Sequence, residues 1–157
     1  MDYQEARIME TPEVRSVPFI NKSRISPLPN EALSAIPLGG NCKGKDFFIP
    51  PIRNPSTKNP FYYLWFIKQA NERYGRLLLP GQGTIQPENA NSAVISITLN
   101  KETLENALGP LTDDFYAKPF LIEFDVSDKK YLSPENRYLD ADANEDSVYW
   151  VVSFTKC

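Results

Sequence analysis

The chain has no histidine among its 157 residues. This absence excludes Ser-His-Asp and Cys-His catalysis, imidazole general bases and histidine-ligated zinc. Any hydrolytic chemistry would therefore have to use carboxylates, lysine, tyrosine or cysteine. The side chain that most often responds to pH near neutrality is missing as well.

Cysteine is scarce, because Cys42 and Cys157 are the only two in the chain. Two thiols cannot form a metal cluster alone, although one disulfide could join them. Residues 1–5 contain neither the basic nor the apolar stretch that opens a secretory signal. We therefore expect two free thiols in a reducing, cytoplasmic setting.

Long apolar runs and basic blocks are also absent. The longest apolar run, residues 61–67, is too short to span a bilayer, so we expect a soluble, intracellular protein with no membrane partner. The 17 Lys and Arg residues are scattered and are outnumbered by 20 Asp and Glu residues, which gives a net charge of -3. Binding to DNA or RNA normally requires clustered cations that neutralise phosphates. The acidic balance argues against nucleic acid as the main ligand.

Proline is abundant and unevenly distributed, with nine of the 14 prolines in the first 60 residues. Each proline fixes its own backbone angle and pushes the preceding residue out of the helical region, which excludes long helices there. The same segment carries recurring apolar residues, which disordered linkers lack. We predict a proline-rich extended arm over residues 1–59 and a globular domain over residues 60–157. The arm then lies either on this domain, as one unit, or on a partner's surface.

Two segments carry helix start and stop signals. Asn59 and Pro60 are suited to a helix N-terminus and Gly75 to a stop, which predicts a central helix over residues 60–74. The competing interpretation is a strand, since the Tyr, Trp and Phe residues of this run favour strands. A second, shorter helix is predicted over residues 101–108, capped by Asn100 and ended by Gly109.

Three segments alternate apolar and polar residues with the period of two that is typical of a sheet: residues 93–99, 120–126 and 148–154. Residues 46–49 and 76–79 are weaker strand candidates. The fold class that follows is α+β, with a mixed or antiparallel sheet of about four to five strands and two helices. This order of elements resembles a ferredoxin-like arrangement with an extra strand.

An acidic segment before the last strand places oxygen-bearing side chains at every second position, at Asp140, Asp142, Asn144 and Asp146. The first calcium ligands of an EF-hand loop have this spacing. The glycine and the final glutamate of that pattern are missing, so we favour a solvated acidic loop. A divalent metal at these four residues is the alternative, and we expect no other cofactor.

Glu123 and Asp125 lie on the same side of one predicted strand, opposite Phe124. Two carboxylates on one sheet face could hold a metal or act as an acid–base pair. We favour the simpler interpretation, in which they belong to the solvent-facing side of a half-buried strand.

Two kinds of residue are candidates for partner binding. Proline-rich pieces can adopt polyproline II geometry and dock into aromatic grooves, whereas Tyr and Arg side chains are favoured at binding hot spots. The candidates are Pro27, Pro29, Pro50, Pro51, Arg53, Tyr131, Arg137 and Tyr138.

These observations predict a non-enzymatic interaction module, regulatory or inhibitory, that acts by protein–protein contact. Its partner is another protein or a second copy of the chain, and no complete catalytic motif is evident. One alternative is a carboxylate-dependent protein that binds a divalent metal or uses it for hydrolysis. The other is binding of single-stranded nucleic acid, which the charge balance places last.

Overall fold

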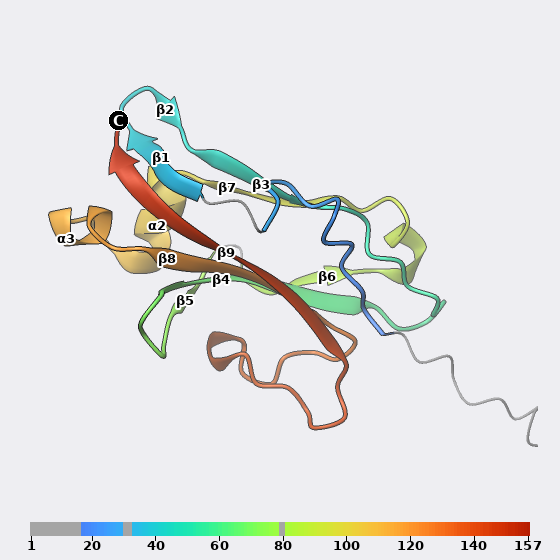
Figure 1. The fold of residues 1–157 in the computed structure, drawn as a ribbon. Helices are drawn as coiled ribbons and strands as arrows, with labels where there is room; N and C mark the ends of the chain where they lie inside the picture. The colour runs from blue at the N-terminus through green and yellow to red at the C-terminus, as the bar shows by residue number, and fades with distance from the viewer. Residues whose placement is uncertain (1–16, 30–32, 79–80) are drawn as a thin grey trace, which may run out of the picture.

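The computed structural model describes residues 17–29, 33–78 and 81–157, and strands make up most of its regular structure (Figure 1). In chain order the strands are β1 (Leu33–Gly39), β2 (Cys42–Lys43), β3 (Lys45–Ile49), β4 (Phe61–Gln69), β5 (Arg76–Leu77), β6 (Gly83–Ile85), β7 (Ile95–Leu99), β8 (Phe120–Ser127) and β9 (Glu145–Lys156). The helical segments are α2 (Lys101–Leu108), α3 (Asp113–Tyr116) and the 3₁₀ turns η1 (Pro87–Asn89) and η2 (Pro134–Asn136).

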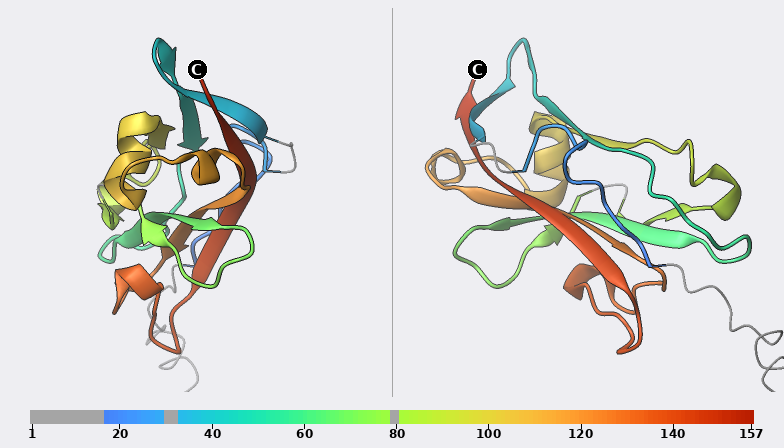
Figure 2. Two further views of the ribbon diagram at one scale, coloured as in Figure 1. Left: turned by 90° about the vertical axis from the view of Figure 1, so that its left-hand side faces the viewer. Right: turned by 45° about the vertical axis from the view of Figure 1, so that its right-hand side comes forward.

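One curled sheet has the strand order β2-β1-β9-β8-β4-β5, and β6 pairs with the first residues of β4. β1 runs parallel to β9, whereas the other neighbouring strands are antiparallel. β3 and β7 form a separate antiparallel ribbon. The views in Figure 2 show β9, in red, crossing the molecule with its C-terminal end beside β1 and β2.

The expected α+β fold with a ferredoxin-like order is wrong. Strands hold 40% of the described residues and helices 13%, so the described part of the chain is mainly β structure. The curled sheet has the shape of a half-barrel and contains seven strands, more than the small sheet that we expected. The largest single cause is the segment predicted as a central helix, which forms a strand.

Residues 61–69 form the strand β4. Trp65 and Ile67 belong to the main core, while Leu64 and Phe66 belong to a second cluster on the opposite face of the sheet. A strand that is buried on both faces carries an unbroken apolar run, which by its period alone also fits a helix that is apolar all round. Gly75 does not end a helix, but lies close against the strand β4. A Cβ atom at this position would come within 2.3 Å of the carbonyl oxygen of Ile67.

The second predicted helix is confirmed as α2. The Asn100 side chain accepts a hydrogen bond from the backbone N–H of Thr103 at 2.8 Å, and Gly109 ends the helix with a φ of 83°. The alternating segments are confirmed as β7, β8 and β9, and the two weaker candidates correspond to β3 and β5. No helix within the described ranges is long and apolar enough to cross a membrane.

The main core lies between the curled sheet and the β3–β7 ribbon, and α2 and α3 contribute Leu104 and Phe115 to it. Trp150 of β9 stacks on Trp65 with ring centroids 6.0 Å apart and meets Phe47 of the ribbon edge-on at 4.9 Å. Aromatic side chains of this size bury large apolar areas and dominate the packing of a core.

The described part of the proline-rich segment packs onto this core in cis. β1 pairs with β9 and β3 pairs with β7, while Ile20 and Ile25 are buried in the main core. The indole N–H of Trp150 donates a hydrogen bond to the carbonyl oxygen of Pro27 at 2.7 Å. Residues 17–29 and 33–59 thus supply strands and core side chains to the same unit as the rest of the chain.

Cys42 and Cys157 form a disulfide with their Cα atoms 6.0 Å apart, so the expected free thiols are wrong. The bond joins β2 to the residue that follows β9, and the backbone N–H of Cys157 donates to the carbonyl oxygen of Leu38 at 2.9 Å. The two cysteines are 115 residues apart in sequence. The antiparallel pairing of β2 with β1 and the parallel pairing of β1 with β9 bring them together, and no local pattern indicates the β1–β9 pairing.

Candidate functional site

Residues 128–144 connect β8 to β9 and fold back over the outer face of the sheet. Tyr131 of this loop packs against Leu64 and Phe66 of β4, and Leu139 joins the same cluster. The backbone N–H of Tyr131 also donates to the side-chain oxygen of Gln82 at 3.2 Å. The loop, which carries η2 and is drawn in orange in Figure 1, therefore covers side chains that a bare sheet face would leave in water.

Two carboxyl groups of β8, Glu123 and Asp125, lie beneath this loop. They alternate with Phe124, which is buried in the main core, as the sequence pattern predicts. The interpretation of this face as solvent-facing is wrong, because Asp125 is 2% exposed and the Glu123 side chain 19%. A period of two identifies the face of a strand but cannot show that a distant loop covers that face.

Arg137 binds Glu123 and fixes the loop to the sheet. It follows η2 with a left-handed backbone, at a φ of 58°. Its Nη1 donates a hydrogen bond to Oε2 of Glu123, and its guanidinium lies 4.3 Å from the centroid of the Phe66 ring. An ion pair and a cation–π contact at one partly buried guanidinium stabilise the loop in this position.

The two carboxyl groups differ in protonation. Burial raises the pKa of Asp125 to about 10, helped by its hydrogen bond with Glu123 and by the charges of Glu123 and Glu145. Burial also acts to raise the pKa of Glu123, but hydrogen bonds with Asp125 and Arg137 hold that pKa below its usual value. Near neutral pH the site therefore contains Asp125 as a neutral acid and Glu123 as a carboxylate. Oδ2 of Asp125 is buried and has no hydrogen-bond partner within the described part of the chain, which costs less free energy for a neutral acid than for a carboxylate.

Tyr131 and Glu145 complete the cluster. The Tyr131 hydroxyl donates to Oε2 of Glu145 at 2.9 Å. Burial, followed by the negative charges nearby, raises the pKa of Tyr131 far above its usual range, so the phenol remains a donor. Burial also raises the pKa of Glu145, although the hydrogen bond from Tyr131 opposes this shift.

A pocket of about 270 Å³ opens next to Arg137. The turn between β4 and β5 contributes Arg73 and Tyr74, and the segment around η2 contributes Arg137 and Tyr138. Tyr74 and Tyr138 are 71% and 64% exposed, so both aromatic rings are accessible from solvent. We call this feature the Arg-Tyr pocket; Phe66, Gly75, Glu135 and Asn136 line the rest of it.

Only part of the predicted partner-binding set gathers at this pocket. Arg137 and Tyr138 line it, whereas Tyr131 is buried in the cluster beneath the loop. The other candidates do not line it: Pro27 is buried, Pro29 and Pro50 are half-buried, and Pro51 and Arg53 are exposed after β3.

Sequence reasoning misses Arg73 and Tyr74 as site residues, because the predicted helix over residues 60–74 hides the turn that carries them. The available signal is the polar stretch of residues 70–75, which ends in glycine and separates two apolar segments. Such a stretch is typical of a turn between strands.

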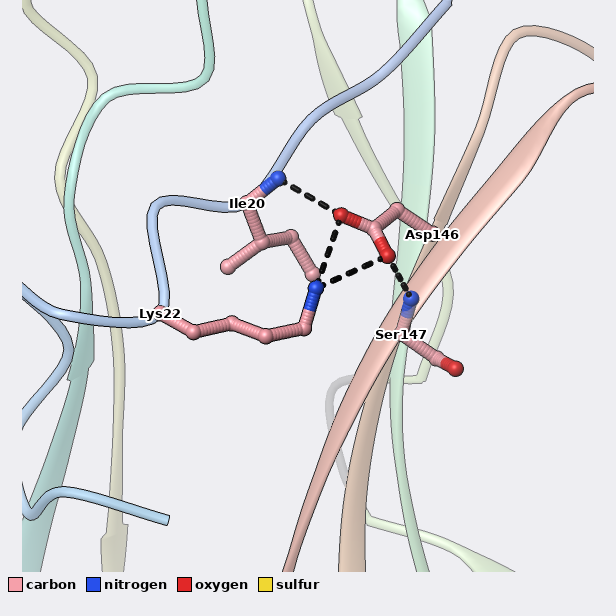
Figure 3. A network of polar contacts seen from close by, with 4 residues as sticks. All are labelled: Ile20, Lys22, Asp146 and Ser147. Carbon is pink, nitrogen blue, oxygen red and sulfur yellow. Dashed lines mark hydrogen bonds and ion pairs between the residues drawn. The ribbon is translucent and has the colours of Figure 1, made fainter.

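The predicted metal ligand Asp146 is committed to a different contact (Figure 3). Its Oδ2 accepts a hydrogen bond from the backbone N–H of Ile20 at 2.7 Å, and its Oδ1 accepts one from the N–H of Ser147 at 2.9 Å. Lys22 forms an ion pair with the same carboxylate at 3.1 Å. Asp146 thus connects the N-terminal segment to the start of β9.

The other predicted ligands also have separate partners. Asp142 pairs with Lys129 at 2.7 Å, and the Asn144 side chain donates to Asp128 at 2.9 Å. The carbonyl oxygen of Asp140 accepts a bond within the same turn. Within residues 17–29, 33–78 and 81–157, no three His, Cys, Asp or Glu side chains form a group that could hold a metal ion. A metal at this loop stays a prediction that the geometry does not support.

Comparison of the chain with protein-family models, with curated proteins and with solved structures gives no match.

Proposed function

We propose that this protein is a non-enzymatic binding module that contacts a partner protein through the Arg-Tyr pocket. The observation that carries the proposal is the convergence of Arg73, Tyr74, Arg137 and Tyr138 on one pocket from two loops that are far apart in sequence. Arg and Tyr are enriched among the residues that dominate binding energy at protein interfaces.

The pocket also has the organisation expected of a binding hot spot. Phe66 and the stem of Arg137 form a rigid part, because the guanidinium is held by Glu123 and stacks on the Phe66 ring. The Tyr74 and Tyr138 side chains are exposed and can close on an incoming group. A fixed base with aromatic side chains around it lowers the entropy lost when a partner binds.

Pocket variants compared with a matched surface variant test this proposal. Arg73→Ala and Tyr138→Ala should remove a partner recovered with the wild-type protein by gentle affinity purification from its native cell. Tyr149→Ala is the control, because Tyr149 is 59% exposed on β9 and does not line the pocket. Equal recovery with all three variants would contradict the proposal. Light scattering of the purified chain identifies the case in which the partner is a second copy.

A carboxylate-dependent hydrolase is the second candidate, and the buried Glu123–Asp125 pair favours it. Paired acids whose pKa values are shifted in opposite directions are typical of acid–base catalysis. Neither carboxyl lines the Arg-Tyr pocket, however, and Glu123 is held by Arg137. We therefore place this candidate second. Hydrolysis of an ester or glycoside substrate that Glu123→Gln abolishes would reverse the order.

The expected cytoplasmic location also stays a prediction. The Cys42–Cys157 disulfide argues for an oxidising compartment instead, because reducing systems in the cytosol keep most thiols free. Alkylation of free thiols in intact native cells, followed by mass spectrometry, decides between the two: labelling of both cysteines supports the cytoplasm, and protection supports an oxidising setting.

A further inference from the structure

The Arg-Tyr pocket brings two guanidinium groups together on an acidic protein. The chain carries a net charge of -3, yet two guanidinium groups, Arg73 and Arg137, line the pocket. Glu135 is the one carboxylate in its lining, and Glu123 pairs with Arg137 beneath it. Guanidinium groups present planar pairs of N–H donors that match the two oxygens of a carboxylate. The guanidinium of Arg73, which is exposed, and the donors of Arg137 that Glu123 does not use thus favour an anionic group on the partner.

Arg137 has donors left after it binds Glu123. The hydrogen bond to Glu123 uses one N–H of Nη1. Nε is buried and has no hydrogen-bond partner within the described part of the chain, so the donors left for a ligand are the other N–H groups of Nη1 and Nη2. A guanidinium carries five N–H donors, so a single carboxylate does not saturate it. The contact with the Phe66 ring holds the guanidinium plane in place while it serves two acceptors.

We propose that an acidic segment of the partner protein places a side-chain carboxylate against Arg73 and Arg137, and that Glu123 takes up a proton as this carboxylate binds. The inference rests on the proposed function and names the chemistry of the partner. It makes Arg137 the shared cation between the partner and the buried carboxyl pair.

The proton uptake follows from the charges that surround Glu123. Burial opposes its ionisation, and its pKa stays low because Arg137 and Asp125 donate hydrogen bonds and because Arg137 and Lys68 are positive. A second anion on Arg137 weakens that support and adds like-charge repulsion, so the pKa of Glu123 rises. Asp125 cannot take its place, because it is already neutral near pH 7. Burial raises the pKa of Glu145, so Glu145 is the other acid that could take up the proton, and the Glu123→Gln variant below distinguishes the two. The titratable and charged groups near Glu123 include Lys68, Asp125, Tyr131, Arg137, Glu145 and Tyr149, its cross-strand neighbour on β9.

The test uses the full chain and two matched pools of blocked peptides, one with a fixed central glutamate and one with glutamine at the same position. We expect the glutamate pool to bind roughly tenfold more tightly, which is the usual advantage of a charge-assisted hydrogen bond. Titration calorimetry at about pH 6, in two buffers of different ionisation enthalpy, should detect net proton uptake with the glutamate pool only.

Two variants separate the parts of the inference. Glu123→Gln keeps an acceptor for Arg137 but cannot ionise, so we expect tighter binding of the glutamate pool, by roughly threefold or more, and no proton uptake. Arg73→Ala should weaken binding of the glutamate pool and leave proton uptake per bound peptide unchanged. Arg73 is exposed, so its replacement leaves the fold intact and keeps the test valid if Glu123→Gln unfolds.

The outcomes distinguish this inference from the proposed function. Equal binding of the two pools, lost in Arg73→Ala, supports the pocket as a protein-binding site and overturns the acidic partner. Tighter binding of the glutamate pool without proton uptake overturns the role of Glu123. Displacement of the peptide by millimolar inorganic phosphate at equal affinity identifies a small-anion site and overturns the partner segment. Failure of both pools to bind overturns the inference, whereas the proposed function is judged by its own variants.

Discussion

The Asp146 carboxylate accepts a hydrogen bond from the backbone N–H of Ile20, across 126 positions of sequence and a distance of 2.7 Å. The same carboxylate pairs with Lys22, and Ile20 is fully buried in the main core (Figure 3). One side chain at the start of β9 therefore holds the segment that brings Ile20 into the core. A residue that the sequence presents as a metal ligand instead organises the fold.

We expect Asp146→Ala to destabilise the protein by about 1–3 kcal/mol, the usual effect of leaving a partly buried backbone N–H without its charged acceptor. The free energy of unfolding from urea titration measures this change. Hydrogen exchange should be faster at Ile20 than in the wild type. Asp113→Ala is the matched control: its carboxylate pairs with Lys156 on the surface, where such pairs contribute little. An equal loss in both variants would contradict the organising role of Asp146.

Local sequence patterns predict the elements of this fold far better than their arrangement. The period of two identifies β7, β8 and β9, and the cap residues Asn100 and Gly109 identify α2, because both signals are local. The prediction for β4 is wrong because residues 128–144, more than 50 positions later in the sequence, cover the outer face of this strand. Long-range cover turns an alternating strand into an unbroken apolar run, which looks the same as a buried helix.

The candidate site is predictable in part for the same reason. Arg137 and Tyr138 stand out because Arg and Tyr are common at interfaces, and the Glu123–Asp125 pair stands out by its alternation. No local signal shows that Arg137 reaches Glu123 or that Arg73 comes to the same pocket. Those contacts form only when the β8–β9 loop packs back onto the sheet, and this tertiary packing leaves no local pattern in the sequence.

Reduction of the Cys42–Cys157 disulfide should lower stability by roughly 2–5 kcal/mol, because the bond closes a long loop and restricts the unfolded chain. The cysteines are separated by 115 residues, so nearly three quarters of the chain lies within the loop. The melting temperature with and without reductant measures the effect. A Cys42→Ser, Cys157→Ser double variant should melt like the reduced wild type and show no response to reductant. An unchanged wild-type melt in reductant would exclude a stabilising disulfide.

Asp125 should make the protein less stable as pH rises. Burial raises its folded-state pKa to about 10, above the unfolded value of about 3.8. The folded state therefore keeps a proton that the unfolded state releases, and this stability is complete below the unfolded pKa and lost progressively up to the folded pKa. Asp125→Asn should gain stability relative to the wild type between about pH 5 and pH 9. Urea midpoints of both proteins across this range check the trend.

The titratable neighbours of Asp125 affect the pH dependence of stability in different ways over this pH range. The pKa of Glu123 is lowered, so its contribution changes only below about pH 5, and the raised pKa of Tyr131 acts above about pH 10. The raised pKa of Glu145 also makes the free energy of unfolding fall as pH rises, as Asp125 does. The Glu145→Gln variant measures how much of the fall comes from Glu145. Parallel curves for the wild type and Asp125→Asn would contradict a buried neutral acid.

Substitutions at Gly44 and Gly109 allow the cost of backbone strain to be measured apart from the cost of a steric clash. Gly44 and Gly109 have nearly the same positive φ, 82° and 83°. A Cβ atom at Gly44 would lie 2.1 Å from the carbonyl oxygen of Leu99, whereas a Cβ atom at Gly109 meets nothing within 4 Å. We expect Gly109→Ala to cost about 1–2 kcal/mol through its backbone alone and Gly44→Ala to cost clearly more. Equal free energies of unfolding would mean that the chain can shift away from Leu99 at no cost.

Removal of Arg137 should open the β8–β9 loop without unfolding the sheet. The guanidinium links η2 to Glu123 and to the Phe66 ring, while the strands that flank the loop are held by their own ladder. We expect Arg137→Ala to increase hydrogen exchange at residues 131–138 by tenfold or more, about 1.4 kcal/mol of lost local stability, and to leave β8 and β9 protected. Arg137→Lys keeps the charge but not the planar contact, so exchange should be intermediate. If the whole sheet exchanged faster instead, Arg137 would support the global fold, and the loop would not be a separately stabilised cover for the carboxyl pair.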